Sequence, residues 1–357
     1  MCEDSKSYKA NSLLVSIVTF RSERVIASCL HSLQTAIGTL NGTEVHVVVV
    51  DNASQDGTVG TLKDLARSEL GRQLEFELVV NSTNLGYGRA HNMAIERVDS
   101  DLVLVLNPDI ALSASSVQDM LGELCDSPDL GAVGPCFKKD DICVPALCAR
   151  NTILADVLKF WGGGFLLPSP RKLPLETLHH IDGHHWYLSG ACLLVRRKAL
   201  TSIGDGFDER YFMFMEDDDL CRSLVAAGWA IGICPEAIVT HVGGDSFLDD
   251  SGAGDCRALG WKWYVRILSG WYYHTKWSPR SMGTLALVVC IAALPVRAIA
   301  SLLISLCSGV YERLAHPGDK RATGWLRQGL GLLRAIRYLF VHITQRRPAG
   351  FPCLEEG

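Results

Sequence analysis

Four consecutive acids, Glu216, Asp217, Asp218 and Asp219, are the most specific candidate for chemistry in this 357-residue sequence. Adjacent like charges repel one another, so such a run is solvated, binds a cation, or begins a helix whose dipole favours negative charge. The aromatic stretch YFMFM leads directly into the acids, and leucines at helical spacing follow. A carboxylate placed there beside a cleft can take the proton of a hydroxyl group as a general base. The pattern predicts a helix start with a catalytic carboxylate, and simple helix capping is the alternative.

Two shorter polar clusters follow apolar runs. Asn107 and Asp109, in NPD, come directly after LVLVL, and a carboxylate held there by a rigid proline can coordinate a divalent ion that bridges two phosphates. Asp51 and Asn52 come after VHVVVV, where a carboxylate can accept hydrogen bonds from a nucleobase or a ribose. Turns also prefer Asn, Pro and Asp, so each cluster has a plain turn as its alternative. His241, in THVGGDS, is a further candidate for a metal ligand or a phosphate contact.

A regular series of elements positions these candidates. Apolar, β-branched runs predict strands at 13–20, 45–50, 75–80 and 101–106, and helical spacing predicts helices at 21–40, 62–70 and 88–98. Uninterrupted apolar strands that alternate with helices indicate a parallel sheet covered on both faces. Open sheets of this kind bind ligands at the carboxyl ends of their strands, which is where the polar clusters fall. The first half of the chain therefore predicts a nucleotide-type crevice.

The middle of the chain is less regular. Residues 135–185 are rich in Pro, Gly, Cys and His and are typical of a long excursion on the substrate side. A strand is expected at 187–196, a loop and helix at 207–228, and a last strand at 231–241. The segment GYGRAH at 86–91 is a degenerate glycine fingerprint that follows the third strand instead of the first, which argues against a dinucleotide-binding oxidoreductase.

Charge divides the chain in two. Residues 257–347 hold 14 Lys and Arg against 2 Asp and Glu, a net charge of +12, while residues 1–256 carry −15. A strongly basic end indicates an anionic partner. Seven Trp and Tyr fall between residues 261 and 277, and such rings favour a membrane interface. Because long apolar runs follow and no nucleic-acid-binding fold is apparent, we expect an anionic lipid surface and no nucleic acid.

The apolar segments 283–294 and 298–310 are each shorter than the roughly 20 residues of a spanning helix. Pro295, Val296 and Arg297 separate them, so two interfacial helices or a re-entrant hairpin are favoured over one kinked span. Residues 325–341, with Arg327, Arg334 and Arg337, have the pattern of an amphipathic helix in the plane of the membrane. Packing on the catalytic domain or in a dimer is the alternative.

The thiols and the N-terminal residues indicate a compartment. The chain has 13 cysteines, an odd number, without a CxxC pair, and its first residues, MCEDSKSYKANS, contain no apolar signal segment. Reduced thiols in the cytosol are the expectation.

Taken in order, seven segments resemble the motifs of the inverting family 2 glycosyltransferases of GT-A fold, over about residues 13–247. They are VSIVTF, VVVVDNASQDGT, NLGYGRAHNMAI, LVLVLNPDI, LSGACLLVRR, FDERYFMFMEDDDLCRSLVAAGW and AIVTHVGGDSF. NLGYGRAHN and NPD look most like bacterial rhamnosyltransferases that use dTDP-L-rhamnose. The resemblance implies an α/β fold, a GT-A (nucleotide-diphospho-sugar transferase) Rossmann-like mixed sheet, to which this chain adds a C-terminal α-helical membrane-associated extension.

Roles carry over from the matching motifs. The resemblance implies that Asp217 is the general base and that Glu216 and Asp219 hold the acceptor or the loop. It implies that Asp109 binds Mg²⁺ or Mn²⁺ and that His241 is the second metal or diphosphate contact. Asn107 stands in the family's usual DxD motif, where a neutral amide is a weaker oxygen donor, and it is expected to hydrogen-bond the donor sugar or ribose.

The other implied contacts also come from the motifs. Asp51 is expected on the nucleobase and Thr19 in the lining of the donor pocket. Further expected donor-binding residues are Asn52, Asn84, Gly86, Arg89 and Asn92. The expected acceptor-binding residues are Trp186 and Gly190.

These expectations define a domain plan and a function. A catalytic domain at 1–256 has a donor half at about 13–110 and an acceptor half at about 111–256, followed by a membrane-docking region at 257–345 and a tail at 346–357. The implied reaction moves a sugar, L-rhamnose from dTDP-rhamnose, onto a lipid-linked or polysaccharide acceptor at the cytoplasmic face of the inner membrane. A transferase using another UDP- or GDP-sugar and a non-catalytic sugar-nucleotide-binding scaffold are the alternatives, and a homo-oligomer is left open.

Overall fold

The computed structural model of the chain describes residues 11–139, 142–161, 178–242, 256–315 and 321–345. It divides into two compact units, which we describe separately. The first unit comprises residues 1–150, 168–209 and 216–245, and the second comprises 151–167, 210–215 and 246–357. The second unit thus takes in two segments, 151–167 and 210–215, that precede the expected boundary at residue 256.

A mixed nine-stranded sheet forms the first unit, in the order β3-β2-β1-β4-β10-β6-β11-β5, with β7 paired to β6. Strands β1 to β4 are mutually parallel, whereas β10 runs antiparallel to both β4 and β6. The strands are β1 (Ser12–Thr19), β2 (Glu44–Asp51), β3 (Phe76–Val80), β4 (Leu102–Leu106), β5 (Ile110–Leu112), β6 (Leu130–Lys139), β7 (Ile142–Pro145), β10 (Cys192–Arg196) and β11 (Ala230–His241). The predicted parallel half is therefore confirmed, and the antiparallel strands make the whole sheet mixed.

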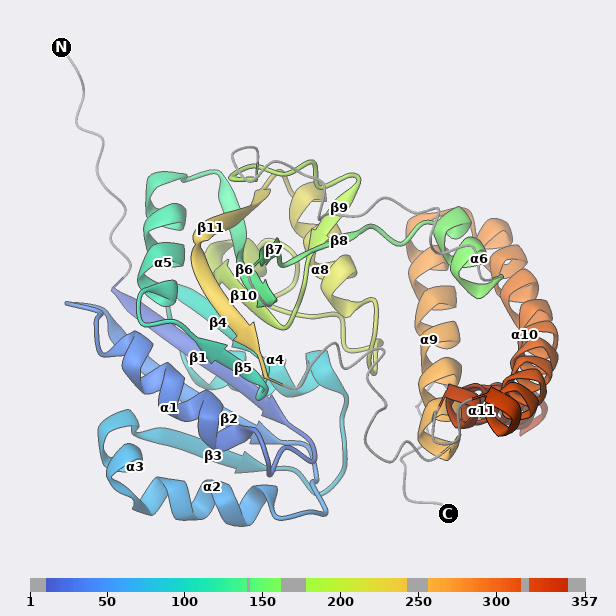
Figure 1. Ribbon diagram of the computed structural model, residues 1–357. Helices are drawn as coiled ribbons and strands as arrows, with labels where there is room; N and C mark the ends of the chain where they lie inside the picture. The colour runs from blue at the N-terminus through green and yellow to red at the C-terminus, as the bar shows by residue number, and fades with distance from the viewer. Residues whose placement is uncertain (1–10, 140–141, 162–177, 243–255, 316–320, 346–357) are drawn as a thin grey trace. The chain divides into compact units, whose positions relative to one another are not determined.

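Helices cover both faces of this sheet, which explains why its central strands are apolar without interruption (Figure 1). Along β1, Leu13, Val15 and Ile17 pack on one face, and Leu14 and Val18 pack on the other. The first face is covered by α1 (Ile26–Ile37), α2 (Thr58–Arg67), α3 (Glu69–Leu74) and α5 (Ser116–Asp126). The second face is covered by α4 (Tyr87–Arg97), α7 (Arg197–Thr201) and α8 (Glu216–Ala226).

The strand expected at 187–196 is two strands. β9 (Trp186–Leu188) pairs with β8 (Leu147–Ala149) in a separate small sheet, and β10 joins the main sheet beside β4. The chain changes partners at residues 189–191, which places Gly190 in the break between the two sheets. Apolar character continues through both strands because each is buried, so the sequence pattern alone does not reveal the break.

The second unit is helical and has its own apolar core. It contains α6 (Ile153–Phe160), α9 (Cys256–Trp277), α10 (Arg280–Ala315) and α11 (Arg321–Gln345). Buried side chains of α9, α10 and α11, among them Tyr264, Leu294 and Leu332, pack together. Helix α10 is continuous through Pro295, so the prediction of two separate apolar helices is wrong. A proline in a helix removes one backbone hydrogen bond, and α10 accommodates it where Pro295 is exposed and the opposite side of the helix is packed.

Candidate active site

The register of the β1–β2 pair brings Thr19 and Asp51 together at the carboxyl ends of these two parallel strands. Thr19 lies opposite Asp51 in the β1–β2 pair, and its hydroxyl donates to Asp51 Oδ1 at 2.9 Å. The backbone N–H of Ser54 donates to Asp51 Oδ2, also at 2.9 Å. Both Thr19 and Asp51 are fully buried. Asp51 is thus a carboxylate fixed at the end of β2 by hydrogen bonds to both of its oxygens.

Side-chain amides build the loop that leads into α4. Asn52 donates to the carbonyl of Gly86 at 2.9 Å and accepts from Asn81 at 3.0 Å, while Asn84 accepts from the N–H of Gly86 at 2.9 Å. Gly86 has φ +90°, a conformation that glycine adopts without a steric penalty. The structure therefore gives Asn52, Asn84 and Gly86 a shared role in shaping this loop.

The side chains of Asn92 and Arg89, two further residues expected to bind the donor, have different surroundings. The amide of Asn92 is engaged by the backbone of Phe207, to whose carbonyl it donates and from whose N–H it accepts, each at 2.8 Å. Asn92 is only 8% exposed, so its observed role is to anchor the segment around Phe207 to α4. Arg89 is exposed, and its guanidinium lies 3.5 Å from the carboxylate of Glu209.

Antiparallel pairing of β5 with β11 brings the two expected metal ligands, Asp109 and His241, close together. Ile110 lies opposite His241, so the neighbouring Asp109 comes within 3.5 Å of the imidazole, measured from Oδ2 to Nε2. Asp109 Oδ1 and His241 Nδ1 are both buried without a hydrogen-bond partner. Unpaired buried polar atoms are rare, and a carboxylate oxygen and an imidazole nitrogen are both suitable ligands for Mn²⁺.

The donor set is incomplete on its own. Among the described residues, no group of three or more His, Cys, Asp or Glu is arranged to hold a metal ion. Asp109 and His241 therefore fit a metal whose remaining ligands come from bound phosphates and water, which is the usual arrangement for Mg²⁺ at phosphate sites.

The four acids begin α8, as predicted, but their environments differ. Glu216, Asp218 and Asp219 are buried, and Asp218 forms a buried ion pair with Arg150 at 2.6 Å. Asp217 is partly exposed, and its Oδ2 accepts the backbone N–H of Gly190 at 3.3 Å. Asp217 is thus the one acid of the four whose side chain is partly exposed.

Surrounding protein and neighbouring charges raise the pKa of two of these carboxyl groups. Burial and the charge of Asp218 raise the pKa of Asp217 to about 6, although the N–H groups of Gly190 and Asp218 oppose this change. Burial, with the charge of Asp217 added, raises the pKa of Glu216 further, to about 8. A base with a pKa just below the working pH is ionised and still basic enough to accept a proton.

Of the two expected acceptor residues, Gly190 lies against this carboxylate. Gly190 contacts Asp217 directly, and a Cβ atom added to Gly190 would lie 3.3 Å from the Cβ of Asp217. Trp186 is half-buried on β9, and its carbonyl accepts a hydrogen bond from Arg150, the partner of Asp218.

One polar residue at this site was not among the predicted ones. Tyr87, the first residue of α4, has its hydroxyl 3.0 Å from Asn107 Oδ1 and 2.7 Å from the carbonyl of Gly190. Burial and the carboxylates of Glu216, Asp217 and Asp109 hold its pKa well above the usual value, so it stays neutral. The sequence offered one signal, a tyrosine between two glycines in NLGYGRAHN.

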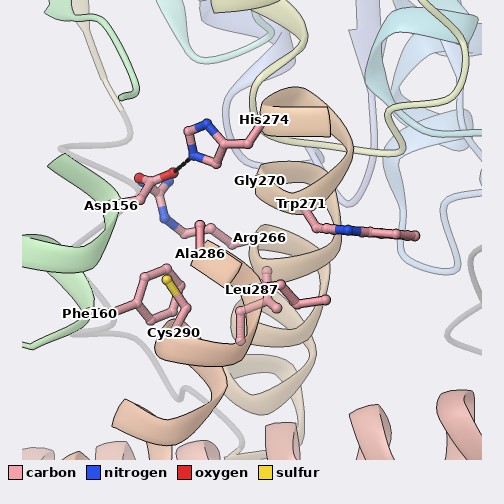
Figure 2. Close-up of a pocket in the computed structure, with 10 residues that line it drawn as sticks. Asp156, Phe160, Arg266, Gly270, Trp271, His274, Ala286, Leu287 and Cys290 are labelled. Atoms are coloured by element: carbon pink, nitrogen blue, oxygen red, sulfur yellow. Dashed lines mark hydrogen bonds and ion pairs between the residues drawn. The ribbon is translucent and has the colours of Figure 1, made fainter. Parts of the chain in front are cut away.

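The second unit contains a different polar cluster, beside a small cavity (Figure 2). His274 lies 2.9 Å from Asp156, Arg266 lies 3.7 Å from it, and both Asp156 and His274 are buried. The cavity, with a volume of about 20 Å³, has room for roughly one water molecule. The contacts of Asp156 with His274 and Arg266 join α6 to α9.

With this geometry in place, the comparisons with known proteins identify the family. A family model described as glycosyl transferase family 2 matches residues 14–204, more than half of the chain, so the chain belongs to this family. The structure of mannosyltransferase PcManGT from Pyrobaculum calidifontis, in complex with GDP-Man and Mn²⁺, aligns with a TM-score of 0.52 at 16% identity. That alignment covers 95% of this chain and 89% of the other. The prediction of a GT-A type mixed α/β fold is confirmed.

Curated relatives narrow the resemblance. The chain is 35% identical over 215 residues to N-acetylglucosaminyl-diphospho-decaprenol L-rhamnosyltransferase of Mycobacterium tuberculosis, an alignment that covers 55% of this chain and 66% of that protein. It is 25% identical over 210 residues to rhamnosyltransferase WbbL of Escherichia coli (strain K12), covering 57% and 75%. The alignment thus spans slightly less than two thirds of the mycobacterial relative. The predicted resemblance to bacterial rhamnosyltransferases is confirmed.

Proposed function

We propose that the protein is an inverting glycosyltransferase that moves L-rhamnose from dTDP-rhamnose onto a hydroxyl group of a lipid-linked or polysaccharide acceptor. One observation carries the proposal. Asp217, the partly exposed acid at the start of α8, contacts Gly190, and Tyr87 links Gly190 to Asn107 in the segment that carries Asp109. A candidate base and a candidate metal ligand thus lie on two sides of one tyrosine.

The residue types suit this reaction. In the proposed reaction, Asp217 takes the proton of the acceptor hydroxyl as its oxygen bonds to the anomeric carbon, and the bond to the nucleoside diphosphate breaks. A single displacement of this kind inverts the anomeric centre. Asp109 and His241 would hold Mg²⁺ or Mn²⁺, which neutralises charge on the leaving diphosphate. Asp51 and Thr19 would bind the nucleoside, and Arg89 lies exposed where an anionic group could pair with it.

The choice of donor and acceptor rests on the relatives. The mycobacterial relative is named for rhamnosyl transfer to N-acetylglucosaminyl-diphospho-decaprenol, and the Escherichia coli relative is a rhamnosyltransferase. We extend the rhamnosyl donor and a polyprenyl-diphosphate-linked acceptor to this chain on that basis.

Side chains of the second unit support a location at a lipid surface. Thirteen of the sixteen large apolar side chains exposed among the described residues belong to this unit. On α10, every exposed position from Leu285 to Leu303 is apolar. Arg297 leaves this face uncharged, because it donates to the carbonyls of Lys159 and Phe160 at the end of α6 and stacks on Trp263. The segment 280–303 is long and apolar enough to cross a membrane, by length and composition.

We place the protein at the cytoplasmic face of the inner membrane. The buried cysteines Cys29, Cys136, Cys192, Cys221, Cys234 and Cys290 are free thiols, as expected in a reducing compartment. The net charge of +12 over residues 257–347 suits the anionic lipids of a cytoplasmic leaflet.

The function is tested by transfer from dTDP-rhamnose to N-acetylglucosaminyl-diphospho-polyprenol in detergent with Mn²⁺, followed by mass spectrometry of the lipid product. UDP- and GDP-sugars are run in parallel. A product that gains one deoxyhexose only with dTDP-rhamnose supports the proposal. A product with another donor only would contradict the rhamnosyl assignment, and tight donor binding without any transfer or hydrolysis would favour a non-catalytic binding protein.

The role of Asp217 is tested by Asp217→Asn. We expect transfer to fall by about 10³-fold, because the base is lost, while the dissociation constant for dTDP with Mn²⁺ changes less than about twofold. The wild-type rate should fall below pH 6, where Asp217 becomes protonated. Asp126→Asn, at an exposed carboxylate in α5, is the matched control. Wild-type turnover by Asp217→Asn would exclude this base.

A further inference from the structure

The hydroxyl of Tyr87 lies between two groups that a single proton cannot satisfy equally. It is 2.7 Å from the carbonyl oxygen of Gly190 and 3.0 Å from the side-chain atom assigned as Asn107 Oδ1. A tyrosine hydroxyl has one proton to donate and lone pairs that accept. A carbonyl oxygen only accepts, so the shorter contact, to Gly190, takes the proton.

This assignment determines the orientation of the Asn107 amide. Oxygen and nitrogen of an amide have nearly the same shape, and the hydrogen-bond network decides which is which. With its proton donated to Gly190, the Tyr87 oxygen requires a donor from Asn107. The NH₂ group of Asn107 therefore faces Tyr87, and its carbonyl oxygen faces away, available to a bound donor.

The same hydroxyl holds the residue that supports Asp217. Gly190 occupies the break between β9 and β10, where a strand ladder does not fix it, and its N–H donates to Asp217 Oδ2 at 3.3 Å. The ring of Tyr87 is itself held by edge contacts with His91 and Phe207, at 4.5 and 6.0 Å between ring centroids. Tyr87 thus provides a fixed anchor for Gly190.

We propose that Tyr87 is a positioning residue that orients the amide of Asn107 and holds Gly190 against Asp217, and that this pairing makes Asn the required residue at position 107. The inference rests on the proposed function, in which Asp217 is the base and Asn107 faces the donor. An Asp at position 107 has no N–H to offer. The hydroxyl would turn toward that carboxylate, and Gly190 would lose its hydrogen bond.

Asp217 reports on this arrangement through its titration. The titratable groups around it are Glu216 and Asp218 beside it in α8, Cys221 one turn further, and Tyr87 from α4. The Gly190 N–H favours the ionised form of Asp217 and lowers its pKa. Loosening Gly190 should therefore raise the pKa of Asp217 by about half to one unit.

The test is a mutant cycle of Tyr87→Phe, Asn107→Asp and the double variant, each made with and without Asp217→Asn. The difference in Tm between each protein and its Asp217→Asn partner is measured from pH 4 to pH 9, which needs no acceptor. A raised pKa in the folded state makes the ionised carboxyl costly, so this difference grows with pH and levels off above the folded pKa. The pH profile of transfer is recorded in parallel.

We expect Tyr87→Phe to raise two values by about half to one pH unit. They are the pH at which the Tm difference stops growing and the pH below which the transfer rate falls. Asn107→Asp moves both readouts upward for two reasons: the added negative charge, and the loss of the hydrogen bond between Tyr87 and Gly190. In the Tyr87→Phe background only the charge effect remains, so the double variant shifts less than the two single shifts combined. Tyr338→Phe, in α11, is the matched control and shifts nothing.

Unchanged titration in Tyr87→Phe, or strictly additive shifts in the cycle, would overturn the inference. Failure of the proposed function has a different signature. If Asp217→Asn transfers sugar normally, Asp217 is not the base, while the Tm cycle still decides whether Tyr87 positions Gly190 and Asn107.

Discussion

At the scale of single residues, one acid run contains three different roles. Asp218 is paired with Arg150, burial raises the pKa of Glu216, and Asp217 remains partly exposed. Four adjacent carboxylates in water would have similar pKa values. Their separation comes from which neighbour and how much burial the fold gives to each.

Glu216 provides a stability prediction. Its Oε2 is buried without a hydrogen-bond partner, and its raised pKa means that ionising it in the folded state is costly. The stability that wild type has with Glu216 protonated is present below the unfolded pKa near 4.5 and is lost as pH rises toward the folded pKa. Glu216→Gln removes this loss, so its Tm should exceed that of wild type by a growing margin from pH 5 to pH 8. A margin that shrinks with pH would contradict the raised pKa.

Asp109 provides a metal prediction. Asp109→Asn removes the charged oxygen that faces His241, and the affinity for dTDP in the presence of Mn²⁺ should fall at least about tenfold. Without metal, the two proteins should bind dTDP about equally. Isothermal titration with and without EDTA measures both affinities. An equal loss of dTDP affinity with and without metal would show that Asp109 contacts the nucleotide directly instead of a metal.

At the scale of elements, the sequence predicted the strands and helices of the donor half because their apolar periodicities are local. It did not predict that 187–196 breaks at Gly190 or that α10 runs through Pro295, since both depend on the partners that the chain finds. Helices α6 and α9 illustrate such a partnership. Burial acts to raise the pKa of Asp156, but the hydrogen bond with His274 and the charges of Arg266 and Lys159 outweigh it, and the pKa is lowered.

His274→Ala tests the contact between these two helices. It leaves the buried Asp156 without its closest partner, and we expect a loss of about 2–3 kcal/mol in the unfolding of the second unit. Tryptophan fluorescence in urea is a suitable measurement, because six of the eight Trp belong to this unit. The control is His31→Ala, at an exposed residue of α1. An unchanged urea midpoint would show that the pair contributes nothing to stability.

At the scale of the whole molecule, the charge division of the sequence corresponds to two kinds of surface. The basic end is a helical unit that exposes apolar side chains, whereas the acidic part forms the sheet that carries the candidate site. Helix α11 also exposes apolar residues, among them Leu330, Leu333 and Phe340, together with Arg337. The in-plane amphipathic helix remains a prediction, and the side chain of Arg327 lies outside the described residues.

Membrane binding by this surface is tested with Leu285→Lys/Ile299→Lys, both on the apolar face of α10. Each exchange removes apolar area from the lipid contact and places a charge there, so binding to vesicles containing anionic lipid should fall at least about tenfold. Ile142→Lys, an exposed apolar residue of β7 in the first unit, is the matched control. Equal binding by wild type and the double variant in co-sedimentation would exclude α10 as the lipid contact.

The sequence by itself determined the local features of this protein: the apolar strands, the polar residues that follow them, the acid run at a helix start and the basic end. These follow from the periodicity and chemistry of neighbouring residues. Only the tertiary structure decided which of these residues meet. Pairing of β5 with β11 brings Asp109 to His241, and the break at Gly190 brings Asp217 and Tyr87 together. Gly190 and Asp217 lie 27 positions apart in the sequence and Tyr87 and Gly190 lie 103 apart. The geometry of such contacts depends on strand register and packing, which no local pattern encodes.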